Sequence, residues 1–150
     1  MGTKFNGSTD EKLALDCFIK LFRASEVIKN NSTRIVNERG FSDGQFFVLD
    51  TLYHLGSMSQ KLLSEKIMRT EGNLTMIISN LLKRKLIKRI RSKDDERVFI
   101  ISITDKGKSE YEKTFPFFLE AVKNGFSVLT KEEKIFFQNI CKKLGTAKFG

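Results

Sequence analysis

Apolar residues recur at helical spacing along most of the chain, and glycines or capping residues mark the breaks between these segments. The first segment runs from about residue 10 to residue 38, and Arg39-Gly40 ends it. Eight of the ten residues from Leu13 to Phe22 are apolar, which makes the apolar band too wide for a helix that buries one face only. We expect this helix to pack against its own chain on one side and against another body on the other.

Two shorter helices follow. Ser42 and Gln45 have the spacing of a capping box and begin a helix that Gly56 ends. Ser59 can cap a short helix from Gln60 to about Met68, and the polar residues 69–72 then break the pattern.

The helix predicted from Asn73 to Lys85 is the most clearly amphipathic segment of the chain. Its apolar residues follow the spacing i, i+3, i+4, i+7 and i+8, namely Leu74, Ile77, Ile78, Leu81 and Leu82. The opposite face is polar and uncharged near its beginning and basic near its end. This face carries Gly72, Met76, Ser79 and Lys83, with Asn73, Thr75 and Asn80 on its flanks.

Leu86–Arg91 and Val98–Ile103 predict two short strands, joined as a hairpin by the polar residues 92–97. Thr104 can cap a long helix after the hairpin, and Pro116 is expected to kink or interrupt it. A second capping box, Thr130 and Glu133, begins a last helix that Gly145 ends. The sequence therefore predicts a mainly α fold with a small β-hairpin wing.

The positive charge of the chain is concentrated in this central region. Lys and Arg number 27 against 18 Asp and Glu, and residues 58–97 alone hold eleven Lys or Arg against five acidic residues. Such a concentration of positive charge attracts polyanions, such as nucleic acid or an anionic membrane surface. A basic face that is merely solvated remains an alternative.

The order of elements narrows that choice. A short helix, a break, an amphipathic helix with an uncharged polar face and a basic hairpin together describe a winged helix-turn-helix. The second helix must bury one face while it offers short polar side chains to base edges, and long cations must lie near phosphates. Asn73, Thr75 and Asn80 meet the first demand, and the second is met by Lys83, Lys88, Arg89, Arg91 and Lys93.

These segments resemble the multiple-antibiotic-resistance regulator (MarR) family of bacterial transcription factors. The resemblance is carried by SQKLLSEKIMRTEGNLTMIISNLLKRKLIKR, by the wing segment DERVFIISITDKG and by the helices on either side. Lys85 is a departure, because the family usually has glycine there. The resemblance implies a winged lobe at residues 41–103, and dimerisation helices at 1–40 and 104–150.

The resemblance also implies a function. The chain would be a homodimeric regulator, most often a repressor, that reads double-stranded DNA at a pseudo-palindromic operator and is released by a small-molecule effector. Arg97 would reach into the minor groove with Asp95 bracing it. The full set of expected DNA contacts is Thr70, Gly72, Asn73, Thr75, Met76, Ser79, Asn80, Lys83, Arg91, Lys93, Asp95 and Arg97.

The distribution of phenylalanine supports a dimer independently of the resemblance. Ten of the fourteen Phe residues lie in the terminal segments 1–40 and 104–150, and none lies between residues 58 and 97. Such short segments cannot bury that much aromatic surface alone, so association is expected. The alternative is that the segments wrap a monomeric core.

Other chemistry is poorly supported. Cys17 stands where organic-hydroperoxide sensors of the family carry a reactive thiol, but its apolar and acidic neighbours predict a buried, inert thiol, as for Cys141. His54 is the only histidine, so we expect no zinc site, catalytic triad, cofactor or enzyme activity. His54 lies near the end of its helix, where we expect a favourable interaction with the helix C-terminus.

No membrane span or secretory signal is apparent, which favours the cytoplasm. A thiol-based sensor and a winged-helix adaptor that does not read DNA remain the alternatives.

Overall fold

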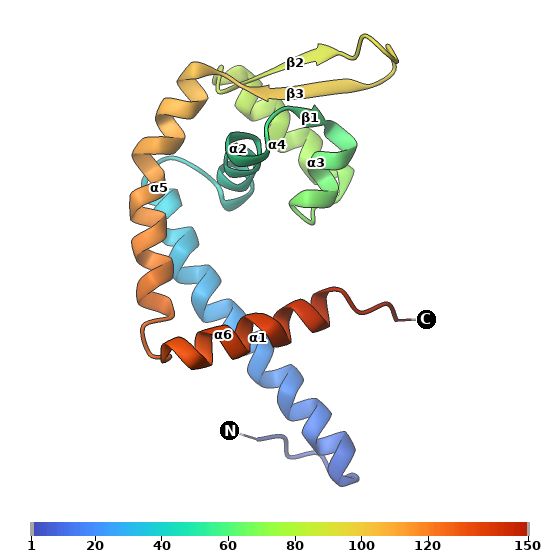
Figure 1. Ribbon diagram of the computed structural model, residues 1–150, viewed down its shortest axis with the longest axis vertical. Helices are drawn as coiled ribbons and strands as arrows, with labels where there is room; N and C mark the ends of the chain where they lie inside the picture. Colours follow the sequence, from blue (N-terminus) through green and yellow to red (C-terminus); the bar gives the residue numbers. More distant parts are fainter. Residues whose placement is uncertain (1, 150) are drawn as a thin grey trace. The chain divides into compact units, whose positions relative to one another are not determined.

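The computed structural model describes residues 2–149, which form six helices and one three-stranded antiparallel sheet. Figure 1 labels these elements. In chain order they are α1 (Thr9–Glu38), α2 (Asp43–Leu55), β1 (Met58–Ser59), α3 (Gln60–Lys66), α4 (Glu71–Lys83), β2 (Ile87–Arg91), β3 (Phe99–Ile103), α5 (Asp105–Gly125) and α6 (Lys131–Gly145). The predicted fold class, mainly helical with a small hairpin, is confirmed.

The chain packs as two units. The terminal unit comprises Met1–Ser32 and Leu119–Gly150, and the central unit comprises Thr33–Phe118. The boundaries fall inside α1 and α5, so each of these helices contributes to both units. This division rests on packing alone, and the functional assignment of residues 1–40 and 104–150 to dimerisation stays a prediction.

The central unit has one core, between α2, α3, α4 and the sheet. Leu49, Leu63, Leu74, Leu81 and Ile101 are completely buried in it. The strand order is β1-β3-β2, and Figure 1 shows β2 and β3 as the projecting hairpin. The sequence did not predict β1, because a strand of two residues is too short to leave a period of its own.

The predicted helix caps are confirmed. Ser42 Oγ accepts from the backbone N–H of Gln45 at 3.1 Å, and Gln45 Oε1 accepts from the backbone N–H of Ser42 at 3.0 Å. Thr130 and Glu133 form the same reciprocal pair at the start of α6. Gly40 adopts a φ of +84° in the turn two residues after the end of α1, a conformation that glycine takes without a steric cost.

The predicted limits of α4 were wrong by two residues at each end. The helix begins at Glu71, because Thr70 is its N-cap and accepts from the backbone N–H of Asn73 at 3.4 Å. Glu71 and Gly72 face solvent, so the apolar period begins only at Leu74 and hides the first turn. At the other end Lys85 has a φ of +59°, which is incompatible with a continuing helix.

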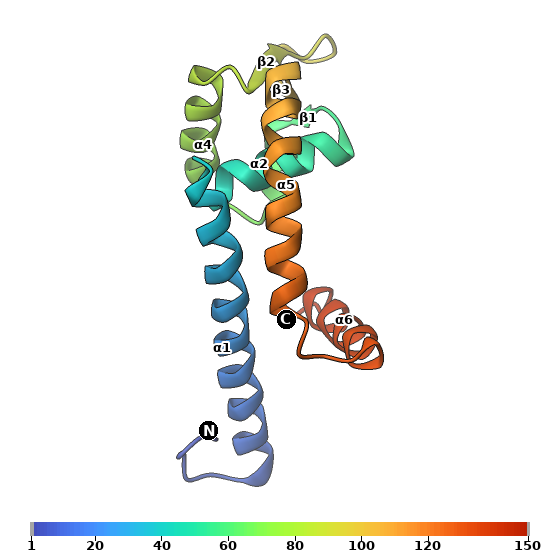
Figure 2. The same ribbon diagram turned by 90° about the vertical axis from the view of Figure 1, so that its left-hand side faces the viewer.

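Pro116 does not interrupt its helix, contrary to the sequence prediction. Figure 2 shows α5 as one helix throughout its length, and Pro116 lies inside it. A proline leaves the carbonyl four residues earlier without its partner. Both Pro116 and Glu112 are exposed, so water can satisfy that carbonyl and the cost of continuing the helix is reduced.

A polar contact inside the central unit joins α5 to α2. The buried Tyr111 donates its hydroxyl to Asp50 Oδ1 at 2.6 Å, and His54 Nε2 lies 3.0 Å from the same hydroxyl. Burial and the Asp50 carboxylate raise the pKa of Tyr111 above its usual value. His54 therefore has a specific packing role that its position near a helix end did not reveal.

The terminal unit leaves much apolar surface uncovered. α6 buries none of its residues, although its apolar positions recur at helical spacing. The large apolar residues of this unit that stay exposed include Leu13, Phe18, Phe22, Val27, Ile135, Phe136, Ile140 and Leu144. This matches the expectation that the first helix has a face which its own chain does not cover.

The prediction that both cysteines are buried was wrong. Cys17 is exposed and Cys141 is partly exposed, and both are free thiols. The apolar neighbours of Cys17 in sequence, such as Phe18 and Leu21, are themselves exposed and therefore do not enclose it. Within residues 2–149, no helix is long and apolar enough to cross a membrane.

The left-handed conformation of Lys85 makes a testable prediction about stability. Lys85→Gly should raise the free energy of unfolding by about 1 kcal/mol, because a side chain in this region of φ is strained and glycine is not. Lys83→Gly is the matched control, since Lys83 is helical and its replacement should lower stability by about 1 kcal/mol. Urea unfolding of both variants checks this, and a loss of stability at both positions would contradict it.

Candidate nucleic-acid interface

α4 presents one face to the core and the other to solvent. Leu74, Ile78 and Leu81 are at most 1% exposed, and they anchor the helix against the rest of the central unit. The predicted outer residues are all exposed, namely Gly72, Asn73, Thr75, Met76, Ser79, Asn80 and Lys83. The structure therefore brings these predicted contacts together on one accessible helix surface.

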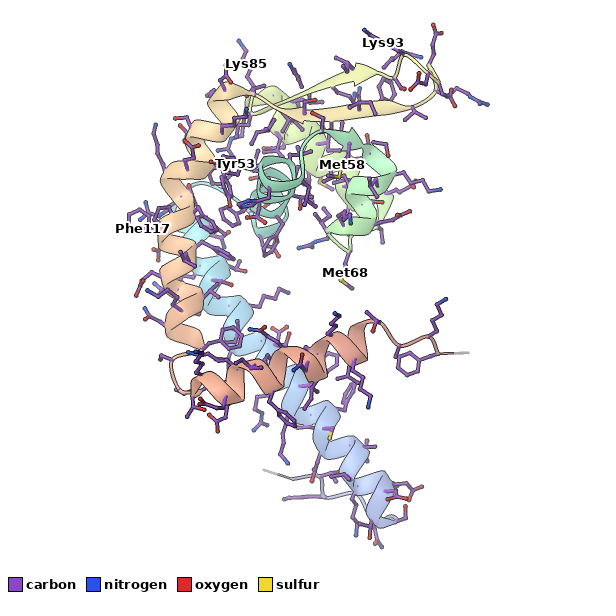
Figure 3. All side chains as sticks on the ribbon, in the orientation of Figure 1. Tyr53, Met58, Met68, Lys85, Lys93 and Phe117 are labelled. Carbon is purple, nitrogen blue, oxygen red and sulfur yellow. The ribbon has the colours of Figure 1, made fainter. Side chains whose placement is uncertain are left out.

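The segment between α3 and α4 is also accessible. Met68 has a φ of +53° and is 91% exposed, and Figure 3 shows its side chain pointing away from the central unit. Thr70 is exposed as well, but its hydroxyl is the N-cap of α4 and is already engaged by the Asn73 backbone. Thr70 is thus foremost a structural residue of this surface.

Not every polar group on α4 is free to bind a partner. Thr75 Oγ1 donates to the Glu71 carbonyl at 2.9 Å and accepts from Gln60 Nε2 at 3.2 Å, so it has no proton left to donate. Asn80 Oδ1 accepts from Gln45 Nε2 at 2.9 Å. Within residues 2–149, the side chains of Asn73 and Ser79 make no hydrogen bond, which leaves both available.

The sheet register sorts the basic residues of the hairpin by face. Arg91 lies opposite Phe99, and Arg89 lies opposite Ile101, so the two arginines share one face of the hairpin. Both guanidinium groups contact the Phe99 ring. The guanidinium carbon lies 4.4 Å from the centre of the ring for Arg89 and 5.2 Å for Arg91. Lys88 lies on the opposite face, although the sequence grouped it with these arginines.

The tip of the hairpin holds an arginine in a fixed geometry. Asp95 accepts from Arg97 Nε at 3.1 Å and from a terminal guanidinium nitrogen at 3.2 Å, while the Arg97 side chain stays 90% exposed. These side-chain bonds, with a further one from the Arg97 backbone, hold the pKa of the Asp95 carboxyl below its usual value. Lys93 lies at the same tip (Figure 3). The brace that the sequence predicted between Asp95 and Arg97 is thus present.

A groove of about 450 Å³ separates the hairpin from the beginnings of α3 and α4. It is lined by Ser59, Gln60, Lys61, Glu71, Arg89, Arg97, Val98 and Phe99. Three of these residues are cations and one is an acid. Lys61 and Gln60 were not predicted as contacts. They lie on the short helix α3, whose sequence has no clear apolar period that would indicate which side chains face the hairpin.

Several cations of the central region are used within the protein. Arg69 pairs with Asp43 at 2.7 Å, and Arg84 donates to the Gly40 carbonyl at 2.9 Å. Arg91 donates to the Glu96 carbonyl at 2.9 Å, which ties one of the predicted contacts to the hairpin turn. The charge count of the sequence therefore overstates the number of cations that are free to meet a polyanion.

No cluster of three or more His, Cys, Asp or Glu residues with the geometry of a metal site occurs within residues 2–149. The exposed side chains of α4 and the hairpin instead combine hydrogen-bonding groups of moderate length with flexible cations. This combination suits base edges and phosphates.

Comparisons with known proteins agree with this geometry. A family model described as transcriptional regulator SarA/Rot matches residues 31–114, more than half of the chain. The HTH-type transcriptional regulator MhqR of Bacillus subtilis is 30% identical over 132 residues, which cover 88% of this chain and 91% of MhqR.

Solved structures share the fold. AbsC, a MarR family transcriptional regulator from Streptomyces coelicolor, matches with a TM-score of 0.83 at 16% identity, over 94% of this chain and 96% of AbsC. BpsR from Bordetella bronchiseptica, whose DNA binding is regulated by 6-hydroxynicotinic acid, matches with a TM-score of 0.79 at 20% identity, over 86% of this chain and 98% of BpsR. With the family model and the MhqR match, this fold places the chain among the SarA/Rot regulators and so in the MarR family of winged helix-turn-helix transcriptional regulators.

Proposed function

We propose that this regulator is a homodimer that represses transcription by binding a pseudo-palindromic operator, and that a small ligand releases it from DNA. The observation that carries the proposal is the exposed polar face of α4 beside a hairpin whose arginine is held by an aspartate. A face of this kind fits a major groove, and an exposed arginine fits the narrower groove beside it.

In this proposal α4 lies in the major groove. Asn73 and Ser79 offer free hydrogen-bonding groups to base edges, and Lys83 lies near a phosphate at the end of the helix. The hairpin then follows the sugar-phosphate backbone of the DNA, and Arg97 enters the minor groove. Asp95 supports this role because it limits the conformations of Arg97 before binding, so that less side-chain entropy is lost on contact.

The exposed apolar surface of the terminal unit supports a homodimer. Phe136 is 68% exposed, Phe18 is 57% exposed and Phe22 is 56% exposed. An uncovered surface of this kind marks an association site. A second copy of the chain supplies the same surface, and two-fold symmetry then gives two α4 helices that suit half-sites about 34 Å apart.

Repression needs no further contact, because a dimer that covers two successive major grooves excludes other proteins from that DNA. Release by a ligand is supported by the fold shared with BpsR, whose DNA binding 6-hydroxynicotinic acid regulates.

Salt dependence tests DNA binding against the alternative of a winged-helix adaptor. A duplex selected from random sequences with the full chain should lose roughly 10³- to 10⁵-fold in affinity between 50 and 200 mM salt, because 6 to 10 phosphate contacts release counterions. Fluorescence anisotropy measures this slope. An adaptor that binds a protein through apolar contacts would select no duplex and would respond little to salt.

Arg97→Ala should weaken binding to the selected operator by about tenfold, because an arginine in a narrow minor groove is lost. Arg97→Lys should recover only part of the affinity, since lysine keeps the charge but cannot form the paired contact with Asp95. Lys108→Ala is the control, as Lys108 is an exposed cation on α5 outside the proposed interface. Equal affinities for parent, Arg97→Ala and Lys108→Ala would exclude a role for the hairpin arginine.

Phe136→Asp should convert the dimer into a monomer of 17.3 kDa, because it places a charge in the proposed apolar interface. Met68→Asp is the matched control, since Met68 is more exposed than Phe136 but lies in the central unit. Sedimentation at micromolar concentration distinguishes the species. A parent chain that sediments as a stable monomer would rule out the homodimer.

A further inference from the structure

We propose that Gln45 is a positioning residue for DNA recognition, which orients the Asn80 amide so that its nitrogen, and not its oxygen, is offered to an acceptor atom of DNA. The inference rests on the proposed DNA-reading function of α4 and adds to it the chemistry of one contact. It follows from hydrogen bonds that link the beginning of α2 to the exposed face of α4.

The orientation of the Gln45 amide is fixed by two donors. Gln45 Oε1 accepts from the backbone N–H of Ser42 at 3.0 Å and from an Arg84 guanidinium nitrogen at 3.3 Å. A backbone amide and a guanidinium can only donate hydrogen bonds. The atom between them must therefore be the oxygen, and Nε2 of Gln45 must point the other way.

Arg84 is itself held in place. It donates to the Gly40 carbonyl at 2.9 Å, and its guanidinium lies 4.6 Å from the centre of the Phe41 ring. Arg84 is also the C-cap residue of α4. Its contacts therefore tie the end of α4 to the turn that precedes α2, and they keep the Gln45 amide from rotating.

This arrangement determines which atom of Asn80 is free. Gln45 Nε2 donates to Asn80 at 2.9 Å, and the partner of a donor must be the oxygen, Oδ1. Asn80 is exposed, and within residues 2–149 its Nδ2 group has no hydrogen-bond partner. Asn80 thus presents two N–H donors to solvent while its oxygen is engaged.

The engaged oxygen changes what Asn80 can recognise. An asparagine that pairs with adenine uses its oxygen to accept from N6 and its nitrogen to donate to N7. Because Oδ1 of Asn80 is turned toward Gln45, only the donating half of that pair faces outward. Its partner is therefore a hydrogen-bond acceptor, which is a base atom of the major groove (purine N7, guanine O6 or thymine O4) or a phosphate oxygen.

Gln45 performs two roles with one side chain, and a single substitution can separate them. A capping box accepts either Glu or Gln at this position, so the substitution Gln45→Glu would leave α2 equally well capped, although a carboxylate has no N–H to donate. Only glutamine caps α2 and donates to Asn80 at the same time. With glutamate, Asn80 would have to turn its nitrogen inward to meet the carboxylate, and its oxygen would face the DNA.

The test uses Gln45→Glu in the full chain, with the duplex selected by the parent. The variant should keep its melting temperature, because the capping box survives, but it should bind the operator about tenfold more weakly, through loss of one hydrogen bond and addition of one charge. Asn80→Asp, which replaces the donor by an acceptor, should lose at least as much. Asn80→Ala should lose about fivefold.

A double-mutant cycle separates the two effects of Gln45→Glu. If Gln45 acts through Asn80, Gln45→Glu should cost about threefold or less in the Asn80→Ala background, where only the added charge remains. An equal cost in both backgrounds would overturn the inference and leave a plain charge effect.

Modified duplexes then identify the DNA atom. Each purine of the half-site is replaced singly by its 7-deaza analogue, which removes N7, and each phosphate singly by a methylphosphonate. Each guanine is also replaced singly by 2-aminopurine, which lacks O6, and each thymine by 5-methyl-2-pyrimidinone, which lacks O4. One such replacement should weaken the parent by about fivefold and leave Asn80→Ala and Gln45→Glu unaffected. A 7-deaza position identifies a purine N7, and a methylphosphonate position identifies a phosphate oxygen.

Failure of the inference is distinguishable from failure of the proposed function. If the parent selects a duplex and binds it with the expected salt dependence, but no single replacement distinguishes it from Gln45→Glu, the orientation of Asn80 is irrelevant to binding and only the inference is wrong. If the parent selects no duplex, both are wrong.

Discussion

The packing of Leu74, Ile78 and Leu81 is the constraint on which the recognition surface depends. Each of these side chains is almost fully buried, and burial of such a side chain contributes about 1.5–3 kcal/mol. Because one face of α4 is held this firmly, the orientation of the opposite face is fixed without help from its own polar residues. Those residues are then available for the proposed contacts with DNA, and an uncharged and weakly helix-favouring set can occupy their positions.

On the same surface, contacts within the protein occupy some of the hydrogen-bonding groups that the proposed DNA interface would use. Thr75 and Asn80 are each held by a glutamine from a neighbouring helix, whereas Asn73 is not. A group that is held loses some of its capacity to bind, but it also loses less entropy when it does. The same holds at the tip of the hairpin. Asp95 reduces the net positive charge of the tip, but its ion pair also fixes the direction of the Arg97 side chain.

Sequence periodicity predicted the elements well where a face is buried, and poorly where it is not. The apolar residues of α4 were identified in full, but its first turn was missed because Glu71 and Gly72 are exposed and add nothing to the apolar period. The interruption predicted at Pro116 was wrong, because the cost of a proline in α5 depends on the solvent around Glu112 and not on the residue type alone. The exposure of Cys17 was mispredicted because apolar neighbours in sequence were taken for apolar surroundings in space.

The candidate site was predictable only in part, for a related reason. Residue types and helix faces placed Asn73, Met76 and Ser79 on the outer surface, and the Asp95–Arg97 pair is close in sequence. The contact between Gln45 and Asn80 joins residues 35 positions apart, and no local pattern reports on it. Gln45 carried a signal for its capping role alone, so its second role needed the relative position of two helices.

The terminal unit poses a different energetic problem, which bears on how the protein assembles. α6 has a complete capping box and 15 residues, yet it buries none of them. A helix of about 12–15 residues is only marginally stable in water without tertiary packing, and a capping box adds about 1 kcal/mol. The packing that α6 lacks within one chain is what an interface with a second copy would provide. Folding of α6 and formation of the proposed dimer would then be coupled, and the stability of the terminal unit would depend on protein concentration.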